Sequence, residues 1–79
     1  MNKYKNLSGE SPIIEYEILD YSIIVKFENK KGDIACYEYT VNKIGGKFFE
    51  QVCVCAKEGQ GLSTFISKNR DIYNSSVKL

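Results

Sequence analysis

The sequence predicts an α+β fold in which a three-stranded antiparallel meander is followed by two helices packed on one face of the sheet (β-β-β-α-α). Two patterns indicate this fold. Between Ile13 and Val41, apolar residues alternate with polar ones, as they do in strands that bury one face. After Val41, apolar residues recur every three or four positions, as they do in amphipathic helices. The change of period separates the sheet from the helices.

The length determines the expected domain organisation. The chain has 79 residues, and a chain of this size buries only about 60–65% of the surface that it exposes when unfolded. We therefore expect one domain over residues 11–73, preceded by a flexible arm (1–10) and followed by a frayed segment (74–79). A core this small favours oligomerisation as an added source of stability.

The first hairpin has a register that can be read from the sequence. A two-residue loop at Asp20 and Tyr21 predicts these cross-strand pairs: Ile18 with Ile23, Tyr16 with Val25, Ile14 with Phe27, and Glu15 with Lys26. The three apolar pairs share one face and the charged pair lies on the other. A slip of one residue would turn the whole apolar set outward, so the register is well determined.

The second hairpin turns within Asn29–Asp33, a segment rich in turn-forming residues. A loop of either three or five residues keeps the apolar faces matched, and a three-residue loop would place Lys26 between Glu15 and Glu38. In the third strand, the core side carries Ala35, Tyr37, Tyr39 and Val41.

The first predicted helix begins near Gly46 or Lys47 and ends at Gly59-Gln60-Gly61, where either Gly59 or Gly61 suits the left-handed position after a helix. The second is predicted from a stripe of apolar residues between Leu62 and Tyr73. The expected core consists of Ile14, Tyr16, Ile18, Ile23, Val25, Phe27, Tyr37, Tyr39, Val41, Phe48, Val52, Leu62, Phe65 and Ile66.

The strand and helix-end residues together resemble the KTSC domain, a small family found at the carboxyl end of some lysyl-tRNA synthetases. The resemblance covers about residues 11–70 and is carried by these matches: Val25-Lys26-Phe27, Tyr37-x-Tyr39-x-Val41, Ala56, Gly59, Leu62 and Ile66. The chain departs from the family pattern at Asn42, at Lys57-Glu58 and at Ser63, and Lys43–Gly46 looks like an insertion. The resemblance implies the same fold and a loose association with RNA, and it implies no catalytic activity.

A candidate anion site lies at Gly59-Gln60-Gly61, before the second helix. Free N–H groups at a helix start attract phosphate, and side-chain donors would come from Ser63, Thr64, Lys68, Arg70 and Lys47. A lone Gly-x-Gly is also typical of a plain corner between two helices, and that alternative stays open. Similarly, Tyr16, Tyr37 and Tyr39 could stack nucleic-acid bases, or they could pack in the core beneath the helices.

The composition argues against several functions. Eleven basic and ten acidic residues give a net charge of +1, which is unlike a duplex-DNA binder with many phosphate contacts. The chain has no histidine, so a general base or a fourth metal ligand is hard to supply. The cysteines Cys36, Cys53 and Cys55 are interpreted as small buried residues. We therefore expect no catalytic residues, no metal and no cofactor.

The expected function is that of a small non-enzymatic binding module for a phosphate-bearing ligand, either RNA or a nucleotide. The alternative is a protein-interaction module, either self-associating or acting as a regulator or inhibitor carried by a mobile element. A homodimer is expected because a meander has two free edges and because Ile13, Ile24, Ile34 and Cys36 make its uncovered face less polar. We expect the protein in the cytoplasm, with no membrane partner, since no leader-like or long apolar segment is visible.

Overall fold

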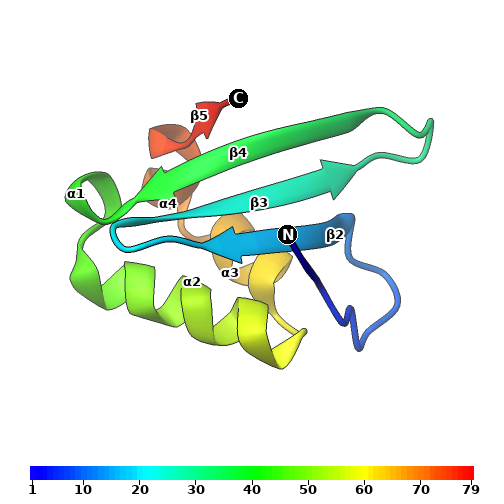
Figure 1. Ribbon diagram of the computed structural model, residues 1–79, viewed down its shortest axis with the longest axis horizontal. Coiled ribbons are helices and arrows are strands. Elements are labelled where there is room, and N and C mark those ends of the chain that lie inside the picture. Colours follow the sequence, from blue (N-terminus) through cyan, green and yellow to red (C-terminus); the bar gives the residue numbers. More distant parts are fainter.

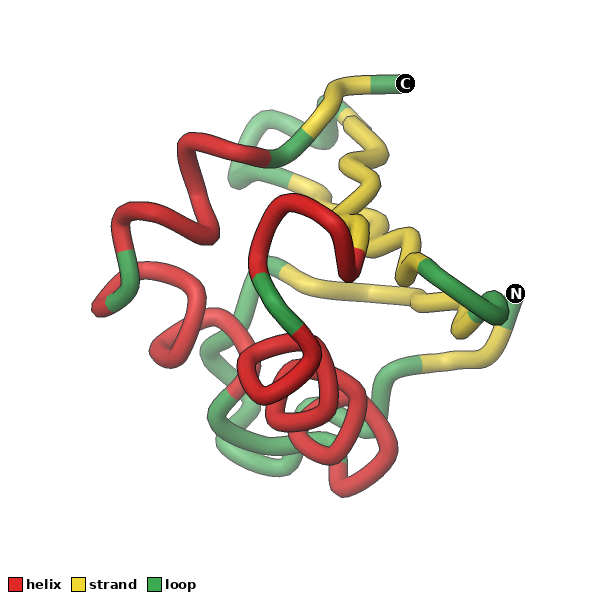
Figure 2. Tube along the Cα trace, turned by 90° about the vertical axis from the view of Figure 1, so that its left-hand side faces the viewer, coloured by secondary structure: helices red, strands yellow, loops and turns green.

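The structure is a computed structural model that describes residues 1–79. The strands are β1 (Asn2–Lys3), β2 (Ile13–Ile18), β3 (Ser22–Glu28), β4 (Ile34–Thr40) and β5 (Val77–Lys78). The helices are α1 (Val41–Ile44), α2 (Gly46–Glu58), α3 (Leu62–Lys68) and α4 (Arg70–Ser75). All five strands form one antiparallel sheet in chain order, and the helices lie on one side of it (Figures 1 and 2). The α+β prediction is confirmed, with two more strands and two more helices than expected.

The register of the first hairpin is confirmed over most of its length. Ile18 pairs with Ile23, Tyr16 with Val25 and Glu15 with Lys26. The carboxylate of Glu15 lies 2.9 Å from the ammonium of Lys26. The hydrogen bond and the opposite charge of each partner stabilise the charged form of the other, so the pKa of Glu15 is lowered and that of Lys26 is raised.

A β-bulge corrects the predicted start of β2. The register shifts between Ile13 and Glu15, so Phe27 pairs with Ile13 and not with Ile14. The bulge inserts one extra residue and reverses which side chain faces the core. Ile13 is therefore fully buried, whereas Ile14, which we expected in the core, is half-buried. The uncovered face also loses one of the apolar residues expected on it.

The second hairpin uses the five-residue alternative. Glu28 pairs with Ile34, which leaves Asn29–Asp33 as the loop. The side-chain oxygen of Asn29 accepts hydrogen bonds from the amides of Lys31 and Asp33, both 2.9 Å long, and Gly32 has a positive φ of 87°. Lys26 consequently pairs with Cys36, while Glu38 accepts a 2.9 Å hydrogen bond from Ser22. The alternative with Lys26 between two glutamates is thus excluded.

The helical half contains two breaks. α1 and α2 are separated by Gly45, and α2 ends at Gly59 in the left-handed conformation, as predicted. The predicted second helix is split at Asn69, whose φ and ψ of −112° and 83° leave the helical region. The side-chain amide of Asn69 donates a 2.8 Å hydrogen bond to the carbonyl of Phe65, which caps α3 and lets the chain turn into α4.

One hydrophobic cluster joins the sheet to the helices. Six predicted members are buried: Ile23, Val25, Tyr39, Val52, Leu62 and Ile66. Five more are partly buried against them: Tyr16, Ile18, Phe27, Tyr37 and Phe65. Val41 was predicted as the end of a strand but begins α1, where it is half-buried. Phe48 was predicted wrongly: it lies in the first turn of α2 on the same side as the buried Val52 and Cys55, but it is 44% exposed.

Both ends of the chain differ from the expected flexible arm and frayed segment. β1 pairs with β2 at one edge of the sheet, and β5 pairs with β4 at the other. Tyr4, in the expected arm, is buried, and its hydroxyl accepts a 3.4 Å hydrogen bond from the amide of Leu62. The sequence of each terminal strand is too short to show an alternation, so neither was predicted.

Two further observations concern burial. Cys53 and Cys55 belong to the core, as the interpretation of the cysteines requires, and burial raises the pKa of the Cys53 thiol. Cys36 is half-buried on the uncovered face of the sheet.

None of the helices is both long enough and apolar enough to cross a membrane.

Candidate ligand-binding cavity

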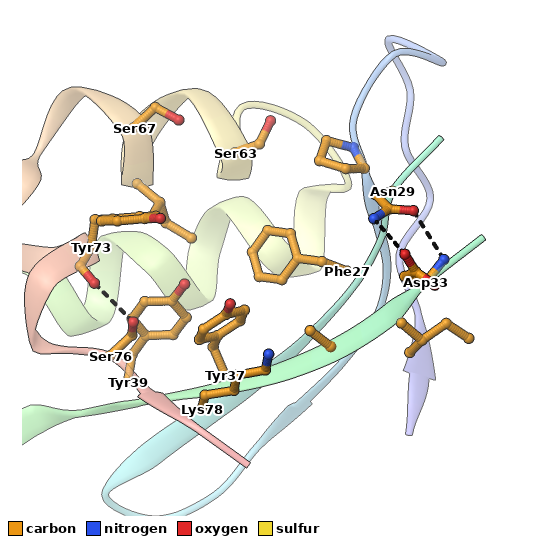
Figure 3. A pocket seen from close by; sticks show the side chains of 14 residues that line it. Phe27, Asn29, Asp33, Tyr37, Tyr39, Ser63, Ser67, Tyr73, Ser76 and Lys78 are labelled. Carbon is orange, nitrogen blue, oxygen red and sulfur yellow. Dashed lines mark hydrogen bonds between the residues drawn. The ribbon is translucent and has the colours of Figure 1, made fainter. Parts of the chain in front are cut away.

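A cavity of about 640 Å³ lies between the covered face of β4 and the two short helices α3 and α4. Figure 3 shows the side chains that surround it. Its walls are formed by Phe27, Ala35, Tyr37 and Tyr39 of the sheet, by Ser63, Ile66 and Ser67 of α3, by Tyr73, Ser76 and Lys78 of the C-terminal segment, and by Pro12, Asn29, Asp33 and Ile34 near the turn. The volume lies within the range of small-molecule sites.

Three tyrosines form the centre of the cavity. Tyr37 and Tyr39 project from β4 two residues apart, on the same face, and Tyr73 reaches over from α4. In Figure 3 their phenol groups point toward the middle of the space. Burial, with smaller contributions from the neighbouring Tyr37 and Tyr73, raises the pKa of Tyr39 to about 12. Tyr39 therefore keeps its proton at neutral pH and can donate a hydrogen bond.

Phe27 extends this aromatic surface. Its ring meets that of Tyr37 edge to face, with a centroid separation of 5.7 Å and an interplanar angle of 80°. Phe27 faces the cavity because it pairs with Ala35, a small residue that leaves the space open. Such a surface can accept the face or edge of a planar ligand.

The lining of the cavity carries one charge of each sign. Near the β3–β4 turn Asn29 and Asp33 are held together, with a 3.3 Å hydrogen bond between their side chains. Lys78 borders the cavity beside Tyr37, its neighbour across β4 and β5. Asp33 and Lys78 are the only charged residues of the lining, and Ser63 and Ser67 border the cavity from α3.

The C-terminal segment encloses the cavity because of two local features. The break at Asn69 turns the chain so that α4 brings Tyr73 over β4. The Ser76 hydroxyl then donates a 2.8 Å hydrogen bond to the carbonyl of Tyr73, and the chain enters β5. Without this reversal the cavity would lack one wall.

The structure separates the residues of the predicted anion site. Gly61 precedes α3 with a φ of 76°, and the first amide of that helix, on Leu62, is already bonded to Tyr4. Ser63 lines the large cavity, whereas Lys68 and Arg70 line a different hollow of about 350 Å³ with Phe48, Ser67, Asn69 and Asp71. Thr64 and Lys47 are exposed and border neither hollow. Of the six predicted residues, only Lys68 and Arg70 are thus brought together.

Sequence reasoning missed four cavity residues. Asn29 and Asp33 were assigned only to a turn, Tyr73 only to an apolar stripe and Lys78 to a frayed end. Their convergence depends on the turn at Asn69 and on the pairing of β5. The three tyrosines considered for base stacking differ in position. Tyr16 packs only against the core, whereas Tyr37 and Tyr39 pack there and also line the cavity.

No cluster of three or more cysteine, aspartate or glutamate side chains is arranged to hold a metal ion. Comparisons with models of protein families, with curated proteins and with solved structures found no match to this chain. The functional argument therefore depends on the cavity itself.

Proposed function

We propose that the protein is a non-enzymatic, cytoplasmic binding module that holds a nucleotide in the tyrosine-lined cavity. One observation carries the proposal: an aromatic cavity whose lining holds both a lysine and an aspartate–asparagine pair. A nucleotide has the matching parts, since it joins a planar base to a phosphate. This ligand belongs to the phosphate-bearing class that the sequence favours.

The chemistry of the lining favours one orientation. The base lies against Phe27 and Tyr37, with its donor groups toward the carboxylate of Asp33. The phosphate lies toward Lys78, where an ammonium and nearby hydroxyls can bind it. In this arrangement Ser63 is the one residue of the predicted anion site that contributes directly.

The resemblance to the KTSC family remains a prediction. The loose association of that family with RNA points to the same class of ligand, and the resemblance adds no residue to the cavity. The proposal does not depend on it.

Calorimetric titration with the four nucleoside 5′-monophosphates at two salt concentrations tests the function. We expect binding that weakens with salt, and a loss of about five- to tenfold in affinity in Lys78→Ala, since a charge-assisted contact to phosphate is removed. Lys57→Ala is the matched control, because Lys57 is exposed on α2 and borders none of the three hollows. Absence of binding at millimolar nucleotide, or equal losses in both variants, would overturn the proposal.

A second candidate is self-association through the uncovered face of the sheet. Its apolar residues are Ile24, Ile34, Cys36 and Val77. β1 and β5 cover parts of both edges, which favours the face over an edge as the contact. Sedimentation of the wild type and of Ile24→Lys tests this, because Ile24 borders none of the hollows and lies between Glu17 and Glu38. A dimer in the first and a monomer in the second are expected, and a monomeric wild type at high micromolar concentration would contradict it.

A further inference from the structure

The tyrosine cavity shares lining residues with two smaller hollows. A hollow of about 360 Å³ is lined by Ser67, Arg70, Tyr73 and Asn74, and shares Ser67 and Tyr73 with the cavity. The hollow that contains Lys68 and Phe48 shares Ser67 and Arg70 with this one. The three spaces therefore follow one another around Ser67, across the junction of α3 and α4. No other residue borders all three.

We propose that this connected surface binds a single-stranded RNA segment of at least two nucleotides, the first in the tyrosine cavity and the next against Phe48, Lys68 and Arg70. The inference rests on the proposed nucleotide site and extends it, because it identifies the ligand as a strand and not a free nucleotide. A strand needs an exit from the cavity and a second set of contacts, and the smaller hollows supply both.

The charges of the second site suit a phosphate. The ion pairs of the molecule are those of Met1 with Glu17 and of Lys26 with Glu15, so neither Lys68 nor Arg70 is held by a carboxylate. Asp71 also borders the hollow, which leaves two cations against one anion. The phosphate that links two nucleotides would pass Arg70, the residue shared by both smaller hollows.

Phe48 supplies a surface for the second base. It is 44% exposed, although it is a large aromatic residue at the covered side of α2. Its ring is fixed against Phe65, with centroids 6.0 Å apart and an interplanar angle of 58°. An exposed ring held in place beside two unpaired cations is the combination that binds single strands through stacking and phosphate contacts.

The test compares short and long ligands on the intact chain. The probes are AMP, CMP and UMP, and the homohexamers of A, C and U in the ribo and deoxyribo forms. We expect the best ribohexamer to bind about tenfold or more tightly than its monophosphate, since a stacked base and a phosphate contact are added. Tighter binding of the ribohexamer than of the deoxyribohexamer is expected for a site that contacts the 2′-hydroxyl.

Two variants separate this inference from the proposed function. The double variant Lys68→Ala/Arg70→Ala should bind the hexamer about tenfold more weakly than the wild type does, with an affinity near that for the monophosphate. Its affinity for the monophosphate should be unchanged. Lys78→Ala should weaken both ligands. Both sets of positions are exposed, so the variants should fold as the wild type does by circular dichroism. Equal affinity for monophosphate and hexamer, or wild-type hexamer binding in the double variant, would overturn the strand site while the nucleotide proposal stands. Absence of monophosphate binding, together with hexamer binding that Lys78→Ala leaves unchanged, would overturn both the strand site and the nucleotide proposal. A preference for the deoxyribohexamer would overturn the assignment to RNA.

Discussion

Over β2 and most of β3, the covered face of the sheet is packed tightly, whereas over β4 it encloses a cavity. The packed half contains Ile13, Ile23 and Val25 with Val52 and Ala56 of α2, all essentially without exposure. The hollow half is covered by α3 and α4, which are short, interrupted and contribute Ser63 and Ser67 to the lining. In Figure 2 the long helix α2 is seen nearly end-on at the bottom, and the short helices α3 and α4 lie at the left.

The comparison shows how one sheet surface serves two purposes. A 13-residue helix with four buried side chains can fill the space beneath it. Two helices of seven and six residues, with a turn between them, bury only Leu62, Ile66 and Ile72 and leave the cavity beside β4. The cavity therefore lies under the part of the sheet that the short helices cover.

The largest expected effect lies in the packed half. Ile23→Ala should lower the free energy of unfolding by about 2–5 kcal/mol, because it removes buried methyl groups and leaves a void. Ser67→Ala, in the hollow half, should change it by less than about 0.5 kcal/mol. Urea unfolding of both variants measures the difference, and similar losses would show that the two halves are packed alike.

The next effect concerns the buried phenol of the hollow half. The pKa of Tyr39 is about 12 in the folded state against 10.0 ordinarily. The phenol of Tyr39 ionises at a lower pH in the unfolded chain than in the folded protein. Its contribution to the free energy of unfolding is therefore complete below pH 10 and is lost as the pH rises toward 12. The loss should be of the order of 2 kcal/mol.

Unfolding curves between pH 9 and 12, for the wild type and Tyr39→Phe, measure the contribution of this phenol. The dependence of stability on pH should be weaker in the variant, and the remainder should come from Tyr4, Cys53 and Lys26, whose pKa values are also raised. An identical slope in both proteins would place the titration elsewhere.

A glycine at the end of α2 gives an intermediate effect. Gly59 has a φ of 75°, and a Cβ there would collide with Lys5 of the N-terminal segment. Gly59→Ala should therefore destabilise the protein by about 1–2 kcal/mol or more. Gly46→Ala is the matched control, since Gly46 lies in the first turn of α2 with open space around it. Thermal melting should show a lower midpoint for the first variant only.

The smallest expected change has the opposite sign. Ser63→Leu should fill part of the cavity and raise the free energy of unfolding by about 0.5–1 kcal/mol, because more apolar area is buried. The same variant should lose nucleotide binding. A more stable protein with unchanged binding would show that the ligand does not occupy the space beside α3.

The sheet was largely predictable because its signals are local. Alternation determined the register of the first hairpin, including the pairing of Tyr16 with Val25. The need to keep the apolar faces matched reduced the second loop to two lengths, three or five residues. The bulge at Ile14 escaped prediction, since Ile13 and Ile14 are equally apolar and only packing chooses between them. The cavity escaped for a different reason: its walls come from five segments whose meeting depends on the break at Asn69.

The contact between Tyr4 and Leu62 has a kinetic consequence. The two hairpins join residues that are close in sequence, so they can form before the rest of the chain is ordered. The hydroxyl of Tyr4, in contrast, meets an amide 58 positions away, and this contact requires the sheet and α2 to be in place. An interaction that forms late in folding is absent from the transition state. We therefore expect Tyr4→Phe to speed unfolding more than it slows folding, which stopped-flow measurement of both rates would check.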